Sequence, residues 1–261
     1  MDRHGRLSAL LEIIGRQGRV DVDDLAAELD VSAATIRRDL DHLAEQQLLS
    51  RTRGGAVANN VAYDLPLRYK AARHAPEKER IARAAAALVE PGSVVGLNGG
   101  TTTTEVARAL ATRSDMSVRA DGPALTVVTN ALNIANELAV RPQVKIVVTG
   151  GVARPQSFEL TGPLATLILA EITLDVVFLG VDALDPRLGA YAHHEGEASI
   201  NRMMAQRARQ VVVVADSSKL GRQAFAQICP TSAVRTLITD SGAPDAVVAM
   251  FESEGVSVQV A

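Results

Sequence analysis

The sequence predicts an α/β protein in two parts: an N-terminal winged helix-turn-helix and a larger, mostly parallel α/β domain. Up to residue 57, apolar residues recur at helical spacing and are followed by two short extended segments. From residue 78 onward, short segments rich in Val, Ile and Leu alternate with helical ones, as in parallel sheets covered on both faces. We therefore place the first domain at residues 1–57, a linker without clear periodicity at 58–77, and the second domain at 78–261.

The first domain should contain three helices, each with one apolar face. These faces consist of Leu7, Leu10, Leu11 and Ile14, then Val22, Leu25, Ala26 and Leu29, and finally Ile36, Leu40 and Leu43. Ser32 is a good N-cap for the third helix. Residues 48–57 follow as two extended pieces around a turn, which completes the outline of a winged helix-turn-helix.

The second domain should contain strands and helices in alternation. The strands are expected at 94–97, 125–129, 144–149, 176–181, 211–215, 237–239 and 256–260. The helices are expected near 79–89, 103–111, 131–139, 163–170, 197–209 and 245–252. Strands that are almost wholly apolar favour a sheet that is buried on both faces.

Composition excludes several classes of protein. The single cysteine, Cys229, excludes an internal disulfide framework and a cysteine-cluster metal site. No apolar run approaches the ~18 residues of a membrane span, and no apolar signal core opens the sequence, so we expect a cytoplasmic protein. The net charge of −3 and the absence of Trp argue against a nonspecific nucleic-acid coat and against a single-strand binder. We expect no cofactor and no metal, with His193 and His194 solvated in a loop.

The third helix should present a DNA-reading face opposite its apolar one. Arginine forks onto guanine, and small side chains allow close approach to thymine methyl groups. A threonine near the helix start and arginines on the wing suit phosphates or the minor groove. Acidic residues outnumber basic ones in this part, so the positive patch must be local. The candidate DNA contacts are Ser32, Ala33, Ala34, Thr35, Arg37, Arg38, Arg51 and Arg53.

This region resembles a known DNA-binding signature. Residues 31–40, together with Leu43, Leu48 and the Arg-Thr-Arg-Gly-Gly-Ala stretch at 51–56, are similar to the signature of the DeoR (deoxyribose-operon repressor) family. The resemblance implies sequence-specific binding to double-stranded operator DNA. Because one winged helix offers few base contacts, we expect a homo-oligomer, a dimer or higher, assembled through the second domain.

A Gly-Gly-Thr-Thr-Thr-Thr segment at 99–104 stands between an expected strand and an expected helix. A glycine-rich turn at a helix start favours an anion, and threonine hydroxyls add donors, so the segment predicts phosphate binding. Three other expected strands end near Asn130, Asp182 and the Asp216–Lys219 stretch. Since ligands of parallel sheets bind beyond the carboxyl ends of strands, these side chains should converge on one crevice.

The second domain is similar to the sensor domain of the same family, which resembles sugar-phosphate isomerases. The matching segments include Lys78, the Gly/Thr loop, Thr149-Gly150-Gly151 and the stretches that end at Asp182 and Lys219. The resemblance implies a phosphorylated-sugar effector, with the loop on the phosphate and the other polar groups on the sugar. The candidate effector contacts are Lys78, Gly99, Gly100, Thr101, Thr102, Thr103, Asn130, Asp182, Asp216 and Lys219.

Two alternatives stay open. An isomerase would need a base and an acid for its enediol intermediate. Asp182 is kept, but the lysine and glycine run that follow it in ribose-phosphate isomerases are absent, so we expect binding without turnover and no catalytic residues. A transcriptional activator would look the same in sequence. The preferred hypothesis is a repressor of sugar-metabolism genes that a phosphorylated sugar releases from its operator.

Overall fold

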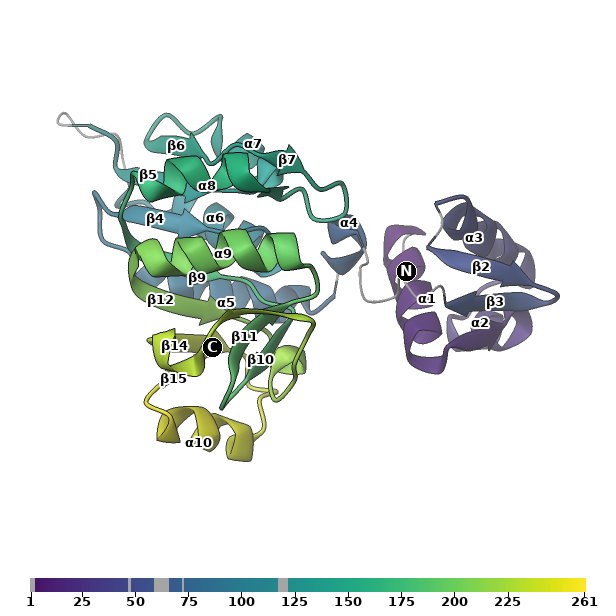
Figure 1. The fold of residues 1–261 in the computed structure, drawn as a ribbon. Coiled ribbons are helices and arrows are strands. Elements are labelled where there is room, and N and C mark those ends of the chain that lie inside the picture. Colours follow the sequence, from purple (N-terminus) through teal and green to yellow (C-terminus); the bar gives the residue numbers. More distant parts are fainter. Residues whose placement is uncertain (1–2, 47, 59–65, 72, 117–121) are drawn as a thin grey trace. The chain divides into compact units, whose positions relative to one another are not determined.

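The computed structural model describes residues 3–46, 48–58, 66–71, 73–116 and 122–261. The chain divides into two compact units, Met1–Arg73 and His74–Ala261 (Figure 1). Each unit has its own apolar core.

The first unit is a winged helix-turn-helix, as predicted. Its elements are α1 (Arg3–Gln17), β1 (Arg19–Asp21), α2 (Val22–Glu28), α3 (Ala33–Glu45), β2 (Leu49–Thr52), β3 (Gly55–Ala58) and α4 (Leu67–Lys70). The strands form an antiparallel sheet in the order β1-β3-β2, and β1 is an element that the sequence did not predict. The apolar faces of α1, α2 and α3 meet in one core, which contains Leu10, Leu25 and Ile36.

The turn between α2 and α3 fixes how the third helix starts. Asp30 adopts φ 51°, a left-handed conformation that breaks α2 from α3. Ser32 caps α3 as predicted, because its Oγ accepts the Thr35 backbone N–H at 3.2 Å. The Ser32 and Thr35 hydroxyls also lie 2.9 Å apart, within hydrogen-bond distance.

The segment expected to be a linker is partly built into the first unit. Residues 59–65 and 72 lie outside the described residues. Tyr69, on α4, is 3% exposed in the core of the first unit, and its hydroxyl donates to Gln46 Oε1 at 2.6 Å. Helix α5 begins at Ala75, so the division between the units falls within the expected linker rather than at its end. An aromatic side chain that anchors one helical turn leaves no periodicity for sequence reasoning to detect.

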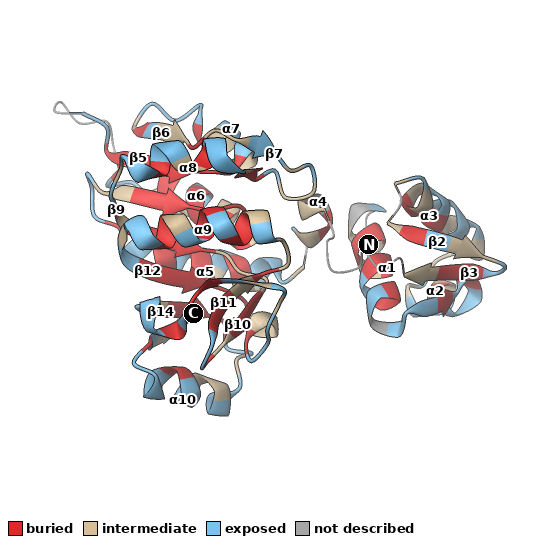
Figure 2. Cartoon of the chain, in the orientation of Figure 1, coloured by how far each residue is buried: buried red, intermediate tan, exposed pale blue. Residues whose placement is uncertain are grey.

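The second unit is built on a seven-stranded parallel sheet in the order β15-β14-β12-β9-β4-β5-β6. Its strands are β4 (Val94–Leu97), β5 (Leu125–Thr129), β6 (Val144–Val148), β9 (Leu174–Leu179), β12 (Ala208–Val214), β14 (Thr236–Thr239) and β15 (Ser257–Val260). Helices α5 (Ala75–Ala87), α6 (Thr101–Ala111) and α7 (Leu132–Leu138) share one core with the sheet. Helices α8 (Pro163–Ala170), α9 (Glu195–Arg207) and α10 (Asp245–Ser253) share the other. Burial is concentrated in the sheet between these two layers (Figure 2).

Several smaller elements were not predicted. Strands β10 (Ala183–Asp185), β11 (Gly189–Ala192) and β13 (Ala226–Cys229) form a separate antiparallel sheet that packs against α9. Strands β7 (Val152–Ala153) and β8 (Leu160–Thr161) form a short hairpin.

Two helices start two residues earlier than expected: α6 at Thr101, which places the threonines inside its first turn, and α9 at Glu195. Within the described residues, no helix is long and apolar enough to cross a membrane.

The order of the strands identifies where a ligand should bind. The chain runs from β4 to β5 and β6 on one side, then returns to the other side of β4 to form β9, β12, β14 and β15. The direction of winding therefore reverses between β4 and β9. In open parallel sheets, ligands bind beyond the carboxyl ends of the strands at such a switch point.

Candidate functional site

The DNA-reading face predicted on α3 is largely exposed. Ala34, Arg37 and Arg38 are exposed, whereas Ile36, Leu40 and Leu43 are buried in the core. The Arg38 Nε donates to the Ala34 carbonyl at 3.3 Å along the same face. Ala33, which was expected on this face, is half-buried and packs against the core.

A buried carboxylate that sequence reasoning missed orients α3. Asp39 is 3% exposed, and its Oδ2 accepts the Arg6 Nε of α1 at 2.6 Å. Arg3 also pairs with this carboxylate at 3.8 Å. Because a buried charge needs a partner, this pairing holds α1 against α3. In the sequence, the signal for this role is that Asp39 is acidic and directly follows two arginines.

The two wing arginines differ in their surroundings. Arg51, on β2, donates from Nε to Asp41 Oδ1 at 2.8 Å and from Nη1 to the Gly55 carbonyl at 2.6 Å. These contacts tie the wing to α3. Arg53 is exposed at the turn, next to Gly54, whose φ of 86° favours glycine.

The Gly/Thr loop lies at the carboxyl end of β4 and leads directly into α6. Gly100 is the N-cap, with φ 148°, and its carbonyl accepts the hydroxyls of Thr103 at 3.2 Å and Thr104 at 2.6 Å. The hydroxyl of Thr103 is therefore used within the loop. Since the first-turn N–H groups of a helix lack intrahelical acceptors, the loop provides backbone donors where an anion would bind.

Asn98 ties the two strands of the switch point together. Its amide nitrogen donates to the Gly180 carbonyl at 2.9 Å, and its amide oxygen accepts the Gly180 N–H at 2.8 Å. Asn98 follows β4 and Gly180 follows β9, so the pair fixes the loop relative to the segment that carries Asp182. Sequence reasoning singled out neither residue of this bridge.

A buried glutamate lies against the same loop. Glu159 is 4% exposed, and a Cβ on Gly99 would come within 2.2 Å of its Cγ, so only glycine fits there. Its Oε2 accepts the Asn130 amide at 2.7 Å. Burial and the nearby Glu197 and Asp182 carboxylates raise the pKa of Glu159 to about 8, despite hydrogen bonds from Asn130 and Asn201 that lower it. Sequence reasoning missed Glu159 because it belongs to the β7–β8 hairpin and, along the sequence, does not follow a strand of the main sheet.

The region around Asp182 is held by further polar contacts. The Asp182 Oδ2 accepts the His193 backbone N–H at 2.9 Å. Glu197, on α9, pairs with Arg154 Nη1 at 2.9 Å, and both side chains are largely buried. The His194 side chain caps α9 by accepting the Gly196 N–H, and both histidines are half-buried. Both histidines thus lie in the loop before α9, as expected, but they are less solvated than expected.

The carboxyl end of β12 carries two predicted residues, Asp216 and Lys219. Asp216 is 3% exposed and caps a short 3-10 helix by accepting the Ser218 N–H at 3.2 Å. Lys219 is half-buried within that turn. Asp240, after β14, binds Ser217 and Gly242; burial raises its pKa, but these hydrogen bonds outweigh burial and lower the pKa overall.

The predicted effector residues other than Lys78 thus lie at the ends of four neighbouring strands, β12, β9, β4 and β5. Gly99, Asn130 and Asp182 gather around Glu159. Asp216 and Lys219 follow the adjacent strand β12. Lys78 is 4% exposed in the first turn of α5, a helix that packs on β12 and β14. Within the described residues, no group of three or more His, Cys, Asp or Glu is placed to hold a metal ion.

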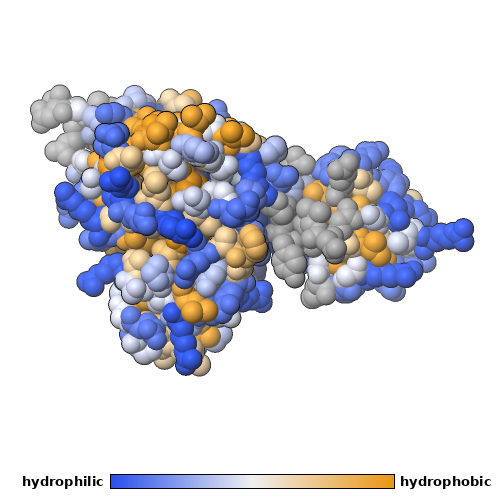
Figure 3. All heavy atoms as spheres, in the orientation of Figure 1, coloured by the Kyte–Doolittle hydropathy of each residue, from blue (hydrophilic) through white to orange (hydrophobic). Residues whose placement is uncertain are grey.

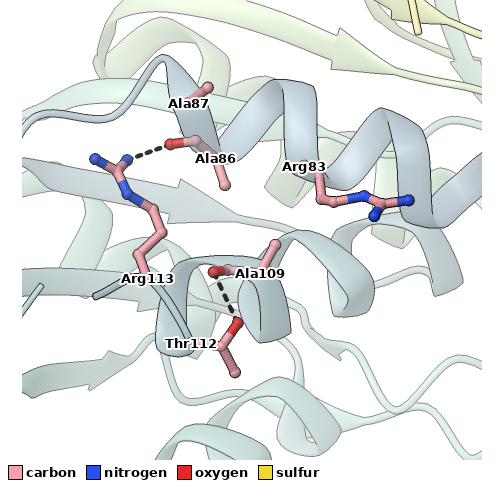
Figure 4. Close-up of a pocket in the computed structure, with 6 residues that line it drawn as sticks. All are labelled: Arg83, Ala86, Ala87, Ala109, Thr112 and Arg113. Carbon is pink, nitrogen blue, oxygen red and sulfur yellow. Dashed lines mark hydrogen bonds between the residues drawn. The ribbon is translucent and has the colours of Figure 1, made fainter. Parts of the chain in front are cut away.

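One surface hollow lies apart from this edge. It has a volume of about 450 Å³ and lies between the C-terminal parts of α5 and α6 (Figure 4). Arg113 borders it and donates to the Ala86 and Val89 carbonyls. The Gly/Thr loop starts α6, whereas this hollow lies where α6 ends, so it contains none of the predicted effector residues. Its lining consists of Arg83, Ala86, Ala87, Ala109, Thr112 and Arg113.

Comparison with solved structures gives partial matches. One is a ribose 5-phosphate isomerase A from Methanocaldococcus jannaschii, with a TM-score of 0.40 and 21% identity, covering 56% of this chain and 54% of that one. Another is the sorbitol operon regulator SorC from Klebsiella pneumoniae, with a TM-score of 0.38 and 15% identity, covering 87% of this chain and 97% of that one.

Comparison with sequences covers almost the whole chain. The glycerol-3-phosphate regulon repressor of Escherichia coli K12 is 31% identical over 260 residues, 100% of both chains. The regulator GlpR of Haloferax volcanii is 35% identical, over 97% of this chain and 96% of that one. The L-fucose operon activator of Haemophilus influenzae is 32% identical, over 90% of this chain and 91% of that one.

Two family models match consecutive parts of the chain. A DeoR-like helix-turn-helix domain matches residues 6–62, and a DeoR C-terminal sensor domain matches residues 73–241. Together with the full-length relatives, these matches show that the chain belongs to the DeoR family of DNA-binding transcriptional regulators.

Proposed function

We propose that this protein represses genes of sugar metabolism and leaves its operator when a phosphorylated sugar binds at the carboxyl ends of β4 and β9. The observation that carries the proposal is the Gly99–Gly100 loop, which leads into the first turn of α6 at the switch point of the sheet. One relative, which aligns over its whole length with 31% identity, is named for the regulon of a phosphorylated polyol, glycerol 3-phosphate. This supports the choice of ligand class.

The phosphate is assigned to the first turn of α6. The backbone N–H groups and hydroxyls of Thr101 and Thr102 supply donors, and the helix dipole favours the negative charge. Thr103 supplies its backbone only, because its hydroxyl binds the Gly100 carbonyl. Lys78 and Lys219 supply positive charge near this edge, while Asn130, Asp182 and Asp216 contact the sugar.

The operator is assigned to the exposed face of α3 and to the wing. Arg37 and Arg38 read base edges, with Ala33 and Ala34 allowing close approach of the helix to the major groove. Ser32 and Thr35 lie at the helix start, where phosphates bind. Arg53 reaches the flanking backbone, and Arg51 positions the wing.

A homo-oligomer brings two such faces to one operator. Helix α8 carries an apolar surface that suits contact between copies: Leu164 and Leu167 are each 64% exposed and Ile168 is 37% exposed. Figure 3 shows apolar surface over this helix. The effector then lowers the affinity for the operator by the same factor by which the operator lowers the affinity for the effector, because coupling between two sites is reciprocal.

Catalysis is not part of the proposal. An isomerase would need a free carboxylate base near the sugar. Glu197 is paired with Arg154, and no lysine stands between Asp182 and Lys219 to supply the cationic partner that ribose-phosphate isomerases carry after this aspartate. One relative is named as an activator. The position of the operator relative to the promoter measures whether this protein represses or activates.

A thermal-shift panel tests the sensor half. Full-length protein is heated with phosphorylated sugars and with their unphosphorylated parents. A ligand at one hundred times its Kd should stabilise the protein by about 2.7 kcal/mol. Stabilisation by a phosphate ester but not by its parent supports the proposal, and no stabilisation by any ester contradicts it.

A second measurement links the ligand to DNA. Duplexes selected by the protein from a random pool serve as operators, and the stabilising ester is added to the complexes. Thr102→Val should weaken release about tenfold, because a donor to the phosphate is lost. Thr112→Val at the far end of the same helix is the matched control and should release normally.

A further inference from the structure

The group around Glu159 is richer in hydrogen-bond acceptors than in donors. It contains the carboxylates of Glu159, Glu197 and Asp182 and the side-chain amides of Asn130 and Asn201. The amides of Asn130 and Asn201 both bind Glu159 through hydrogen bonds, so each turns its NH₂ group toward this carboxyl.

Within the described residues, two oxygens of this group have no partner. The Oδ1 atoms of Asn130 and Asn201 make no hydrogen bond there, and the two residues are only 0% and 2% exposed. A buried acceptor without a donor is costly, so native proteins rarely keep one without a reason. These atoms therefore point to a donor that is supplied from outside the chain.

The chemistry of the missing group follows from its partners. An ammonium has three donors and no acceptor, whereas a hydroxyl has a single donor. Because Asn130 and Asn201 both hydrogen-bond to Glu159, their two amide oxygens lie close to its carboxyl group and add two acceptors beside it. We propose that the effector carries a primary amino group that binds Glu159, Asn130 and Asn201, which makes it a phosphorylated amino sugar. This proposal rests on the proposed function and specifies its ligand.

The position of the group agrees with such a ligand. Glu159 packs directly against Gly99, whose missing side chain leaves room for it, and Gly99 opens the loop assigned to the phosphate. Asn130 ends β5, the strand next to β4. An amino group and a phosphate of one sugar would therefore occupy neighbouring parts of the same edge.

Charge favours the same assignment. Glu159 faces Glu197 from α9 and Asp182 from the segment after β9, and Arg154 donates to Glu197. Burial and these carboxylates keep Glu159 protonated to a pH of about 8. A bound ammonium would stabilise the ionised carboxylate, so binding near pH 7 should release a proton.

Calorimetric titration of the full-length protein tests the proposal. The probes are 2-amino-2-deoxyhexose 6-phosphates of the gluco, galacto and manno series, each with its 2-hydroxy and N-acetyl counterparts. At least one amine should bind about 10- to 100-fold more tightly than its hydroxyl counterpart, because a charged hydrogen-bonded pair replaces a neutral one. Titration in buffers of different ionisation enthalpy should show release of a proton.

Glu159→Gln identifies the group responsible. It keeps the size and one amide-accepting oxygen but loses the charge, so it should bind the amine and the hydroxyl sugar equally well. Asp240→Asn is the matched control, because it removes another buried carboxylate from the same sheet edge and should keep the preference. Ammonium chloride alone, at the same concentration, should not stabilise the protein as the sugar does.

The outcomes separate the two proposals. If phosphate esters bind but amine and hydroxyl members have equal affinity, or if Glu159→Gln keeps the preference, the amino-sugar proposal is wrong and the proposed function stands. If no ester binds at all, the proposed function fails as well.

Discussion

The two units of this protein place their polar groups in opposite ways. In the first unit most candidate contacts, including Arg37, Arg38 and Arg53, are exposed, while the buried Asp39 serves the fold by pairing with Arg6. In the second unit, Asn130, Glu159 and Asn201 are buried at the edge where the ligand should bind. A surface that reads DNA must project into a groove, whereas a sensor of a small molecule must enclose it. Enclosure of the proposed ligand would couple its binding to the packing of β4, β9 and α9.

The largest effect should come from the exposed face. Arg37→Ala/Arg38→Ala removes two candidate base contacts, each worth about 1–3 kcal/mol of discrimination. Operator affinity should fall by a combined factor of about 30 or more, while the melting temperature changes little because both side chains are exposed. Titration of a labelled operator measures this, and unchanged specific affinity would exclude the proposed reading face. Ligand stabilisation of the same variant serves as the control.

The second prediction concerns the enclosed site. Gly99→Ala places a methyl group within 2.2 Å of Glu159 Cγ, in a backbone conformation that needs no glycine for its φ. Overpacking of this kind should destabilise the protein by about 1–3 kcal/mol. Thermal melting checks it, and Gly99→Ala/Glu159→Ala should recover most of the loss. If the double variant is no more stable than the single one, the contact with Glu159 is not the cause.

The sequence could predict features that depend on local signals, but not features that depend on contacts between distant segments. The periodic apolar faces of α1 to α3 and the Ser32 cap are local signals, and they located the winged helix-turn-helix. The strands and the Gly/Thr loop were located in the same way. Glu159, Asn98 and Asn201 were missed because their roles arise from contacts between segments far apart in the chain. Tyr69 was missed for the same reason, since its partner Gln46 is 23 positions away.

A third prediction tests burial through pH. Glu159 has a pKa of about 8 in the folded protein, raised first by burial and then by Glu197. Between its ordinary pKa and 8, the folded state keeps a proton that the unfolded state has lost, so the free energy of unfolding falls as pH rises. From pH 6 to pH 8 this contribution should fall by about 2 kcal/mol, and the small remainder should be lost by about pH 9.

Comparison with Glu159→Gln isolates this contribution, because other groups titrate in the same range. Both proteins are unfolded with denaturant at pH 6, 7, 8 and 9. The difference between their free energies of unfolding should shift in favour of the variant as pH rises. A difference that stays constant across this range would mean that Glu159 is ionised in the folded state throughout.

The smallest effect should come from the ion pair that links the wing to α3. The Asp41 side chain is 59% exposed, and an exposed pair of this kind contributes little stability, so Asp41→Asn should change the free energy of unfolding by no more than about 0.5 kcal/mol. The substitution removes a negative charge from the face assigned to DNA and leaves Arg51 unneutralised. Operator affinity should therefore rise by a factor of about 2 to 5, with a salt dependence steeper by about one counterion. If affinity falls instead, the pair with Asp41 is needed to hold the wing in its binding position. In that case the first unit, like the second, depends on a contact within the protein to prepare its site.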